Sequence, residues 1–166
     1  MSTKPINIGV VGVGHLGIHH VKHYTAIPNV NLLGIYDPDI KRSNYVAKKY
    51  KTIVFQNLEK LIKDVDALSI VTPTQNHFKT AKLCLKNKKH VFIEKPITVT
   101  LEEADKLLEL SKNNSTIIQV GHIERLNPAL MALEPYDINP QFIEIQRLAP
   151  YTVRGTDVPV VLDKMI

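Results

Sequence analysis

Three closely spaced glycines near the start of the chain constrain its fold more than any other feature. Gly12, Gly14 and Gly17 form a G-x-G-x-x-G pattern that directly follows the apolar run Ile6–Val11 and opens a segment with helical periodicity. In this setting the first glycine permits a tight turn, the second lets the backbone approach a ligand, and the third lets helix and strand pack closely. The free N–H groups and positive dipole of the helix N-terminus then favour a pyrophosphate. The pattern therefore predicts a dinucleotide site.

A carboxylate, Asp37, ends the next apolar run, 20 residues after Gly17. At that place it can accept hydrogen bonds from the adenosine ribose hydroxyls, and its charge would repel a 2′-phosphate. NAD is therefore predicted in preference to NADP, although Lys41 and Arg42 lie close enough to keep NADP open. The alternative is that Asp37 only begins a turn with Pro38.

Apolar, β-rich runs alternate with helix-length segments along most of the chain. The expected strands are Ile6–Val11, Leu32–Tyr36, Ala67–Val71, His90–Ile93 and Ile117–Val120. The expected helices are Leu16–Ala26, Ile40–Tyr50, Asn76–Lys86 and Leu101–Lys112, the last opened by a capping box of Thr100 and Glu103. Between Val54 and Ile62 we expect a short strand and a brief helix. The alternation predicts a parallel sheet with helices on both faces, a Rossmann-type doubly wound α/β fold.

The pattern changes after Val120, where prolines recur and a new strand is expected over Phe142–Leu148. We place the boundary near residues 122–140. The sequence thus predicts a nucleotide-binding domain over residues 1–122. Residues 123–166 are expected to form a linker and only the beginning of a second α+β domain.

Composition argues against several other classes of protein. The formal charge is +5, but the lysines are spread over several elements without an arginine-rich arm or interleaved aromatic residues, so no nucleic-acid partner is expected. No apolar run approaches the length that spans a bilayer, and the start has no leader pattern, so a soluble, cytoplasmic protein with no membrane partner is expected. The one cysteine, Cys84, lies among apolar residues and is predicted to be a buried structural thiol.

Four histidines gather at the first helix: His15, His19, His20 and His23. His19 and His23 have the i, i+4 spacing of a metal pair, but no H-E-x-x-H pattern or cysteine accompanies them, so no metal site is predicted. Packing or exposure is the expected role of these side chains. His15, inside the glycine turn, is expected to contact phosphate, and Leu16 to line the same turn.

The sequence Thr72-Pro73-Thr74 follows an expected strand at the edge where open parallel sheets bind ligands. These residues are predicted to contact the cofactor, and Thr74 also fits as the cap of the helix from Asn76. His77 would then lie in the first helical turn, near the nicotinamide.

The sequence Glu94-Lys95-Pro96 follows another expected strand at the same edge. A lysine held there can hydrogen-bond a substrate hydroxyl and stabilise the alkoxide that develops as hydride leaves. From the residues alone, a surface ion pair between Glu94 and Lys95 fits equally well.

Together these motifs resemble the Gfo/Idh/MocA family of nicotinamide-dependent oxidoreductases over essentially the entire chain, and the Glu-Lys-Pro sequence is the most specific of them. The resemblance implies that Lys95 is catalytic, binds the reacting hydroxyl and assists proton transfer, with Glu94 at the cofactor. It also implies a catalytic Asp, matched by Asp163, and a His a few residues later, before which this chain ends. The resemblance therefore implies a fragment that binds cofactor but is catalytically incomplete, and a homo-oligomer when full length.

The stretch from Gly121 to Pro128 resembles members of the family that act on nucleotide-linked acetamido sugars such as UDP-N-acetylglucosamine. This implies oxidation at C3 and substrate contacts from His122, Arg125 and Asn127. A connecting loop in which Asn127 caps a helix opened by Pro128 remains equally open. The expected function is NAD-dependent hydride transfer at a secondary sugar hydroxyl. The alternative is a non-catalytic NAD-binding or redox-sensing module.

Overall fold

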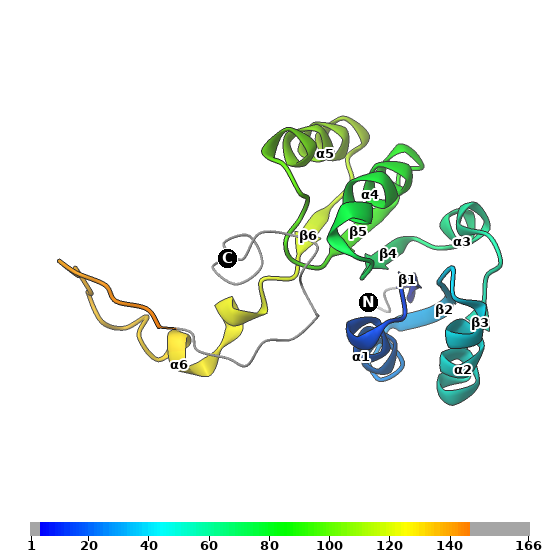
Figure 1. The fold of residues 1–166 in the computed structure, drawn as a ribbon, viewed down its shortest axis with the longest axis horizontal. Helices are drawn as coiled ribbons and strands as arrows, with labels where there is room; N and C mark the ends of the chain where they lie inside the picture. The colour runs from blue at the N-terminus through cyan, green and yellow to red at the C-terminus, as the bar shows by residue number, and fades with distance from the viewer. Residues whose placement is uncertain (1–3, 147–166) are drawn as a thin grey trace. The chain divides into compact units, whose positions relative to one another are not determined.

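The computed structural model describes residues 4–146 of the chain (Figure 1). The chain divides into two compact units, Met1–Gly121 and His122–Ile166. Each unit is described by itself below.

The first unit is built on a six-stranded sheet in which all neighbouring strands are parallel. Its strands are β1 (Ile6–Val11), β2 (Val30–Tyr36), β3 (Ile53–Val54), β4 (Ala67–Ile70), β5 (His90–Ile93) and β6 (Ile118–Val120). The strand order is β3-β2-β1-β4-β5-β6, so the direction of winding reverses between β1 and β4. This is the doubly wound Rossmann-type topology, and the predicted fold class is confirmed.

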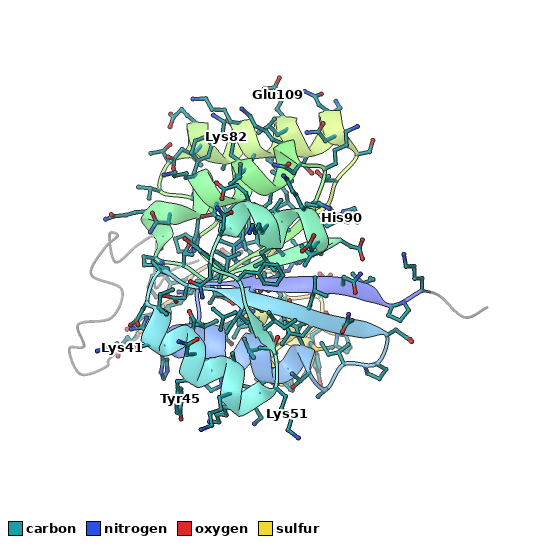
Figure 2. All side chains as sticks on the ribbon, turned by 90° about the vertical axis from the view of Figure 1, so that its right-hand side faces the viewer. Lys41, Tyr45, Lys51, Lys82, His90 and Glu109 are labelled. Atoms are coloured by element: carbon teal, nitrogen blue, oxygen red, sulfur yellow. The ribbon has the colours of Figure 1, made fainter. Side chains whose placement is uncertain are left out.

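Helices cover both faces of this sheet. They are α1 (His15–Tyr24), α2 (Ile40–Tyr50), α3 (Leu58–Asp64), α4 (His77–Lys86) and α5 (Leu101–Asn114), with a 3-10 turn η1 (Thr74–Asn76) before α4. Figure 2 shows Tyr45 of α2 on one side of the sheet, and Lys82 of α4 and Glu109 of α5 on the other. None of the helices within residues 4–146 is long and apolar enough to cross a membrane.

Two hydrophobic clusters hold the layers together, one on each face of the sheet. The adjacent residues Val10 and Val11 belong to different clusters, because successive side chains of a strand point to opposite faces. Val10 packs with residues of α1 and α2, whereas Val11 belongs to the cluster formed with α3, α4 and α5. Cys84 lies fully buried in the second cluster, and burial raises the pKa of its thiol to about 12. The prediction of a buried structural thiol is confirmed.

Polar side chains immediately before α2 and α5 cap the N-termini of these helices. The Thr100 hydroxyl accepts the Glu103 N–H at 3.3 Å, as the predicted capping box requires. The Glu103 carboxylate in turn accepts the N–H of Val99, one residue before the cap. Asp39 caps α2 in the same manner by accepting the Arg42 N–H at 3.0 Å.

Several predicted boundaries differ from the structure, most of them by one or two residues. The first helix begins at His15 and ends at Tyr24, earlier at both ends than expected. The helix after the Thr-Pro-Thr sequence begins at His77, and Thr74 opens the preceding 3-10 turn instead of capping the helix. A tight i→i+3 turn lets the chain change direction before the longer helix starts.

The second unit contains the 3-10 turn η2 (Ile123–Leu126) and the short helix α6 (Pro128–Met131). The strand predicted over Phe142–Leu148 is not formed in its described part, because residues 142–146 pair with no strand within the described chain. A strand needs a neighbour for its backbone groups, and local sequence cannot supply one. Leu148 and Asp163 lie outside the described residues.

Candidate functional site

The glycine turn between β1 and α1 has the geometry that each glycine permits. Gly12 has a φ of +87°, and a Cβ there would lie 2.7 Å from the carbonyl oxygen of Val71. A Cβ at Gly17 would collide with the carbonyl oxygen of Gly12. At Gly14 the nearest atom to an added Cβ is Arg42 Nη1, 3.9 Å away. A side chain would therefore clash at the first and third glycines of the turn, whereas the space beside the second glycine is open.

The start of α1 has the features of a backbone anion site. Gly14 occupies the cap position without a side-chain cap, and the first turn of the helix carries no acidic residue. The unpaired N–H groups and dipole of this turn favour a negatively charged group. The exposed His15 ring lies edge-on to the His19 ring, with 5.7 Å between centroids, and Leu16 is half-buried. The phosphate contact of His15 and the lining role of Leu16 stay predictions.

Asp37 has a structural role in addition to its predicted cofactor role. Its carboxylate is buried and accepts the Val13 N–H at 2.8 Å through Oδ2 and the Asp39 N–H at 2.9 Å through Oδ1. The first bond fastens the glycine turn to the end of β2, and the second is the local turn that the sequence left open. Arg42 lies beside both acids, with guanidinium nitrogens 4.0 Å from Asp37 Oδ2 and 3.4 Å from Asp39 Oδ2.

Three backbone hydrogen bonds bring the polar strand ends together. The Val71 N–H donates to Val11 O at 2.8 Å, the Glu94 N–H to Ile70 O at 3.0 Å, and the Gly121 N–H to Ile93 O at 2.9 Å. The chain therefore leaves β1, β4, β5 and β6 in adjacent positions at one edge of the sheet. The glycine turn, the Thr-Pro-Thr sequence and the Glu-Lys-Pro sequence meet at this edge, as predicted for an open parallel sheet.

Thr72 carries an unsatisfied polar group at this edge. Its hydroxyl oxygen is buried and has no hydrogen-bond partner among residues 4–146. A buried hydroxyl without a partner costs about 1–3 kcal/mol, which a polar group of a bound ligand would relieve. This orphan hydroxyl and the open backbone at Gly14 both fit a dinucleotide laid across the strand ends.

His77 ties the two polar loops together. The residue is only 1% exposed, its Nδ1 lies 2.8 Å from Pro96 O, and its Nε2 lies 2.9 Å from Thr72 O. Both partners are carbonyl acceptors, so each contact is a hydrogen bond only when the facing nitrogen carries a proton. The sequence pattern placed His77 at the start of the helix but did not reveal this bridging role. Its contact with the cofactor stays a prediction.

Glu94 is held inside the site by a histidine. Its Oε1 lies 3.0 Å from His20 Nε2, and the side chains are 13% and 16% exposed respectively. Burial raises the pKa of Glu94, but the hydrogen bond and charge of His20, followed by the backbone N–H and charge of Lys95, outweigh it and leave the pKa below its usual value. The Glu94 side chain is largely enclosed and the charge of Lys95 acts on it, so the alternative of an ion pair between the two residues stays a prediction. Lys95 itself is half-buried and directly follows Glu94 at the end of β5.

The remaining predicted residues lie in the second unit. Asn127 accepts the Ala129 N–H at 2.9 Å and donates to Glu124 Oε2 at 2.8 Å, so it caps α6 as the loop alternative expected. His122 precedes η2 and is half-buried, and Arg125 lies exposed within η2. Their contacts with a substrate stay predictions.

Two residues of the site were missed by the sequence reasoning. His20 of α1 and Ser69 of β4 form a partly buried connection to Glu94. Two signals were available. His20 follows Gly17 by three residues, on the helix face that packs on the sheet, and Ser69 is the one polar residue of the apolar strand β4.

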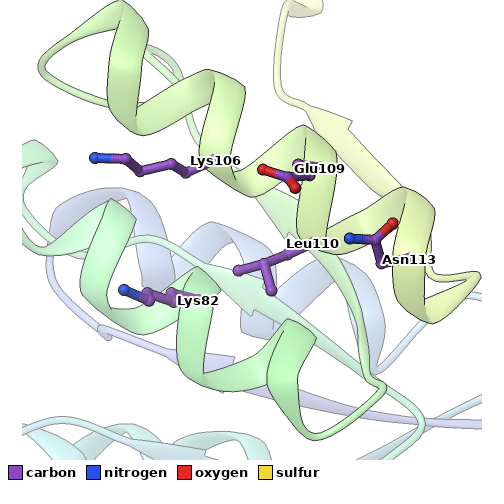
Figure 3. A pocket seen from close by; sticks show the side chains of 5 residues that line it. All are labelled: Lys82, Lys106, Glu109, Leu110 and Asn113. Atoms are coloured by element: carbon purple, nitrogen blue, oxygen red, sulfur yellow. The ribbon is translucent and has the colours of Figure 1, made fainter.

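A separate shallow pocket lies between α4 and α5 (Figure 3). It is lined by Lys82, Lys106, Glu109, Leu110 and Asn113. None of these side chains belongs to the strand-end site. Among the described residues, no three His, Cys, Asp or Glu side chains group closely enough to hold a metal ion.

Comparison with known proteins places this site in a family context. The model of the Gfo/Idh/MocA family, described as an oxidoreductase family with an NAD-binding Rossmann fold, matches residues 6–122. UDP-N-acetylglucosamine 3-dehydrogenase of Acidithiobacillus ferrooxidans is 39% identical over 159 residues, which cover 95% of this chain and 50% of that protein. scyllo-Inositol 2-dehydrogenase (NAD(+)) of Bacillus subtilis is 35% identical over 130 residues, 75% of this chain and 37% of that protein.

A solved structure is similar over nearly all of the chain. It is the UDP-N-acetylglucosamine 3-dehydrogenase GnnA from Acidithiobacillus ferrooxidans, with a TM-score of 0.89 and 37% identity. The similarity covers 98% of this chain and 54% of that one. The present chain thus spans about half the length of this relative.

Proposed function

Because this chain belongs to the Gfo/Idh/MocA family of oxidoreductases with an NAD-binding Rossmann fold, we propose that it binds NAD and serves hydride transfer at a secondary hydroxyl of a sugar. The main support for the proposal is that three features lie together at the carboxyl ends of the strands. These are the open glycine turn, the orphan Thr72 hydroxyl and Lys95 beside an ionised Glu94. Each supplies a different part of the chemistry.

The dinucleotide would lie across the ends of β1 and β4. The N–H groups at the start of α1 bind its pyrophosphate, and Gly14 leaves room for close approach. The Thr72 hydroxyl bonds a polar group of the cofactor further along the edge. Bound NAD supplies the acceptor or donor of the hydride.

Preference for NAD over NADP rests on Asp37. Its buried carboxylate stands at the end of β2, where ribose hydroxyls bind in this fold and a 2′-phosphate would be repelled. Arg42, the nearby cation, already lies against the carboxylates of Asp37 and Asp39. Recruiting Arg42 to a phosphate would leave both acids without this partner.

Lys95 would act on the sugar. In the oxidation direction its neutral amine accepts the proton of the reacting hydroxyl as hydride leaves to NAD, and the ammonium that forms stabilises the developing alkoxide character. In the reverse direction this ammonium gives the proton back to the oxygen as hydride arrives. Glu94 supports the ammonium with negative charge from the adjoining position.

The substrate would be a nucleotide-linked acetamido sugar, oxidised at C3. Support comes from the 39% identity to a UDP-N-acetylglucosamine 3-dehydrogenase over 95% of this chain. His122, Arg125 and Asn127 are the proposed substrate contacts, and Asp163 is the proposed second catalytic residue. We include assembly into a homo-oligomer in the proposal for the full-length protein.

Calorimetric titration of the chain with NADH, and separately with NADPH, tests the cofactor assignment. Saturable binding with at least tenfold preference for NADH is the expected result. Absence of binding to both nucleotides would contradict the glycine-turn assignment, and preference for NADPH would contradict the role of Asp37.

Reduction of NAD by the full-length protein, followed by absorbance, tests the chemistry. NAD reduction by UDP-N-acetylglucosamine, abolished in Lys95→Ala but retained in the matched variant Lys82→Ala, would support a dehydrogenase. NADH binding without reduction of NAD by any sugar tested would instead favour a non-catalytic NAD-binding or redox-sensing module. Lys82 is a suitable control because it is also half-buried yet lies on α4, in the separate pocket.

A further inference from the structure

A half-buried histidine links two strands within the site. His20 of α1 places Nδ1 2.9 Å from Ser69 Oγ on β4 and Nε2 3.0 Å from Glu94 Oε1 at the end of β5. Its ring is flanked by Phe92, edge-on at 5.6 Å between centroids, and by Tyr24 at 6.3 Å. Three elements that are distant in the sequence therefore converge on one imidazole.

The chemistry of the partners assigns the protons on this ring. An ionised Glu94 only accepts, so His20 Nε2 carries a proton and donates it to the carboxylate. Nδ1 accepts the proton of the Ser69 hydroxyl when the ring is neutral and donates to Ser69 Oγ when the ring is charged. Burial raises the pKa of Tyr24 more than its hydrogen bond to Ser69 lowers it, so the phenol keeps its proton at neutral pH. Hydrogen bonds therefore connect Tyr24, Ser69, His20 and Glu94, with His20 as the donor to Glu94.

A serine, a histidine and an acid in contact also suggest a nucleophilic triad, but the burial of Ser69 excludes it. Ser69 is 0% exposed and sits within β4. A nucleophile must reach its substrate, and this hydroxyl has no path to one. The residue through which Ser69 and His20 act on the site is therefore Glu94.

The carboxylate of Glu94 is confined on several sides. His20 holds Oε1, and a Cβ placed on Gly121 would lie 3.0 Å from the same oxygen. The backbone N–H of Lys95 bonds to the carboxylate and the Lys95 charge acts on it. A shift of this carboxylate would therefore release the backbone N–H of Lys95 and alter the charge that faces its side chain.

We propose that His20, anchored by Ser69, is a positioning residue that holds Lys95 in place through the Glu94 carboxylate. The inference rests on the proposed function, since positioning of Lys95 affects catalysis only if its ammonium contacts the reacting hydroxyl. His20 itself touches neither cofactor nor substrate in this arrangement. Its role is to fix the acid that accepts the backbone N–H of Lys95.

Four variants distinguish the hydrogen bond between His20 Nε2 and Glu94 from the one between His20 Nδ1 and Ser69. His20→Gln offers an amide donor at the position of Nε2 and can still bond Glu94. His20→Asn reaches only toward Ser69, and His20→Phe removes both hydrogen bonds while keeping a ring. Ser69→Ala removes the anchor with little change of volume and serves if the larger substitutions do not fold. Thermal unfolding of each variant establishes that it is folded at the temperature of the experiment.

The readout is the rate of acetylation of individual lysines in the full chain, measured by mass spectrometry with Lys82 as internal reference. We expect Lys95 to react at least threefold faster in His20→Asn and His20→Phe, and about twofold faster in Ser69→Ala, because its side chain then reaches solvent more often. In His20→Gln the rate should stay within twofold of the original chain. Lys82 should be unchanged throughout.

Two results would overturn the proposal. One is a Lys95 rate that is the same in all folded variants. The other is a rate that rises equally in His20→Gln and His20→Phe together with Lys82, since that pattern indicates general loosening of the fold. NADH titration of the unsubstituted chain is measured separately and needs no labelling. Failure of cofactor binding is therefore distinguished from failure of the positioning role.

Discussion

The Asp37 carboxylate accepts the backbone N–H of Val13 at 2.8 Å, so the acid expected to select the cofactor also fastens the glycine turn to β2. In the proposed function, binding of the dinucleotide and order in the turn therefore depend on the same buried group. We expect a change at this residue to affect stability through the acceptor oxygens, and cofactor choice through the charge.

The variant Asp37→Asn separates these two contributions because it keeps the size and one acceptor oxygen but removes the charge. We expect the preference for NADH over NADPH to shrink to within about threefold. Loss of one acceptor for a buried N–H should lower the free energy of unfolding by about 1–3 kcal/mol. Titration with both nucleotides and urea denaturation measure the two quantities. An unchanged nucleotide preference would contradict the assignment of Asp37 as the selector.

Substitution of Gly14 is expected to change the thermal stability of the chain and its affinity for NADH in opposite directions. An added Cβ meets nothing closer than 3.9 Å, so Gly14→Ala and Gly14→Asp should both fold. Aspartate at this cap position should stabilise α1 by up to about 1 kcal/mol, but its charge occupies the place of the pyrophosphate. We therefore expect unchanged or higher thermal stability with at least tenfold weaker NADH binding in Gly14→Asp. The alanine variant is the control, and equal affinity in the two variants would place the phosphates elsewhere.

Glu94 should make stability depend on pH in the acid range. Its pKa in the folded chain is below its usual value, so its ionised form adds stability that is present above the unfolded pKa, near about 4.3. That stability is lost as the pH falls through the lower folded pKa. The difference in unfolding free energy between the original chain and Glu94→Gln should be constant above about pH 6 and shrink below about pH 4. A difference that grows on acidification would contradict the direction of the shift.

Cys84 should be inert while the chain is folded. It is fully buried, and burial raises its thiol pKa to about 12, so very little thiolate exists at neutral pH. We expect a thiol-reactive disulfide reagent to label the native chain at least a hundredfold more slowly than the urea-unfolded chain. Comparable rates at neutral pH would mean that the α4 region opens readily. Cys84→Ala provides the blank for reaction elsewhere.

Local sequence patterns predicted the alternating strands and helices well. The runs at Ile6–Val11 and His90–Ile93 became strands with those bounds, and the helix over Ile40–Tyr50 was also correct. These segments are buried on a regular period, so side-chain polarity alone reveals them. The strand expected at Phe142–Leu148 was wrong in its described part, because pairing depends on a partner that local pattern does not supply.

The sequence by itself determined the Rossmann-type fold, the glycine turn and the family, because glycine geometry and hydrophobic periodicity act over short stretches of chain. It also predicted site roles for Asp37, 20 residues after Gly17, and for Lys95, within the Glu-Lys-Pro sequence. Only the tertiary structure decided that Asp37 fastens the glycine turn, that His77 bridges two loops, and that His20 joins Ser69 to Glu94. Those contacts join residues up to 74 positions apart. They form only when the sheet order brings β1, β4 and β5 side by side, and the physical requirement to satisfy buried polar groups then selects the partners.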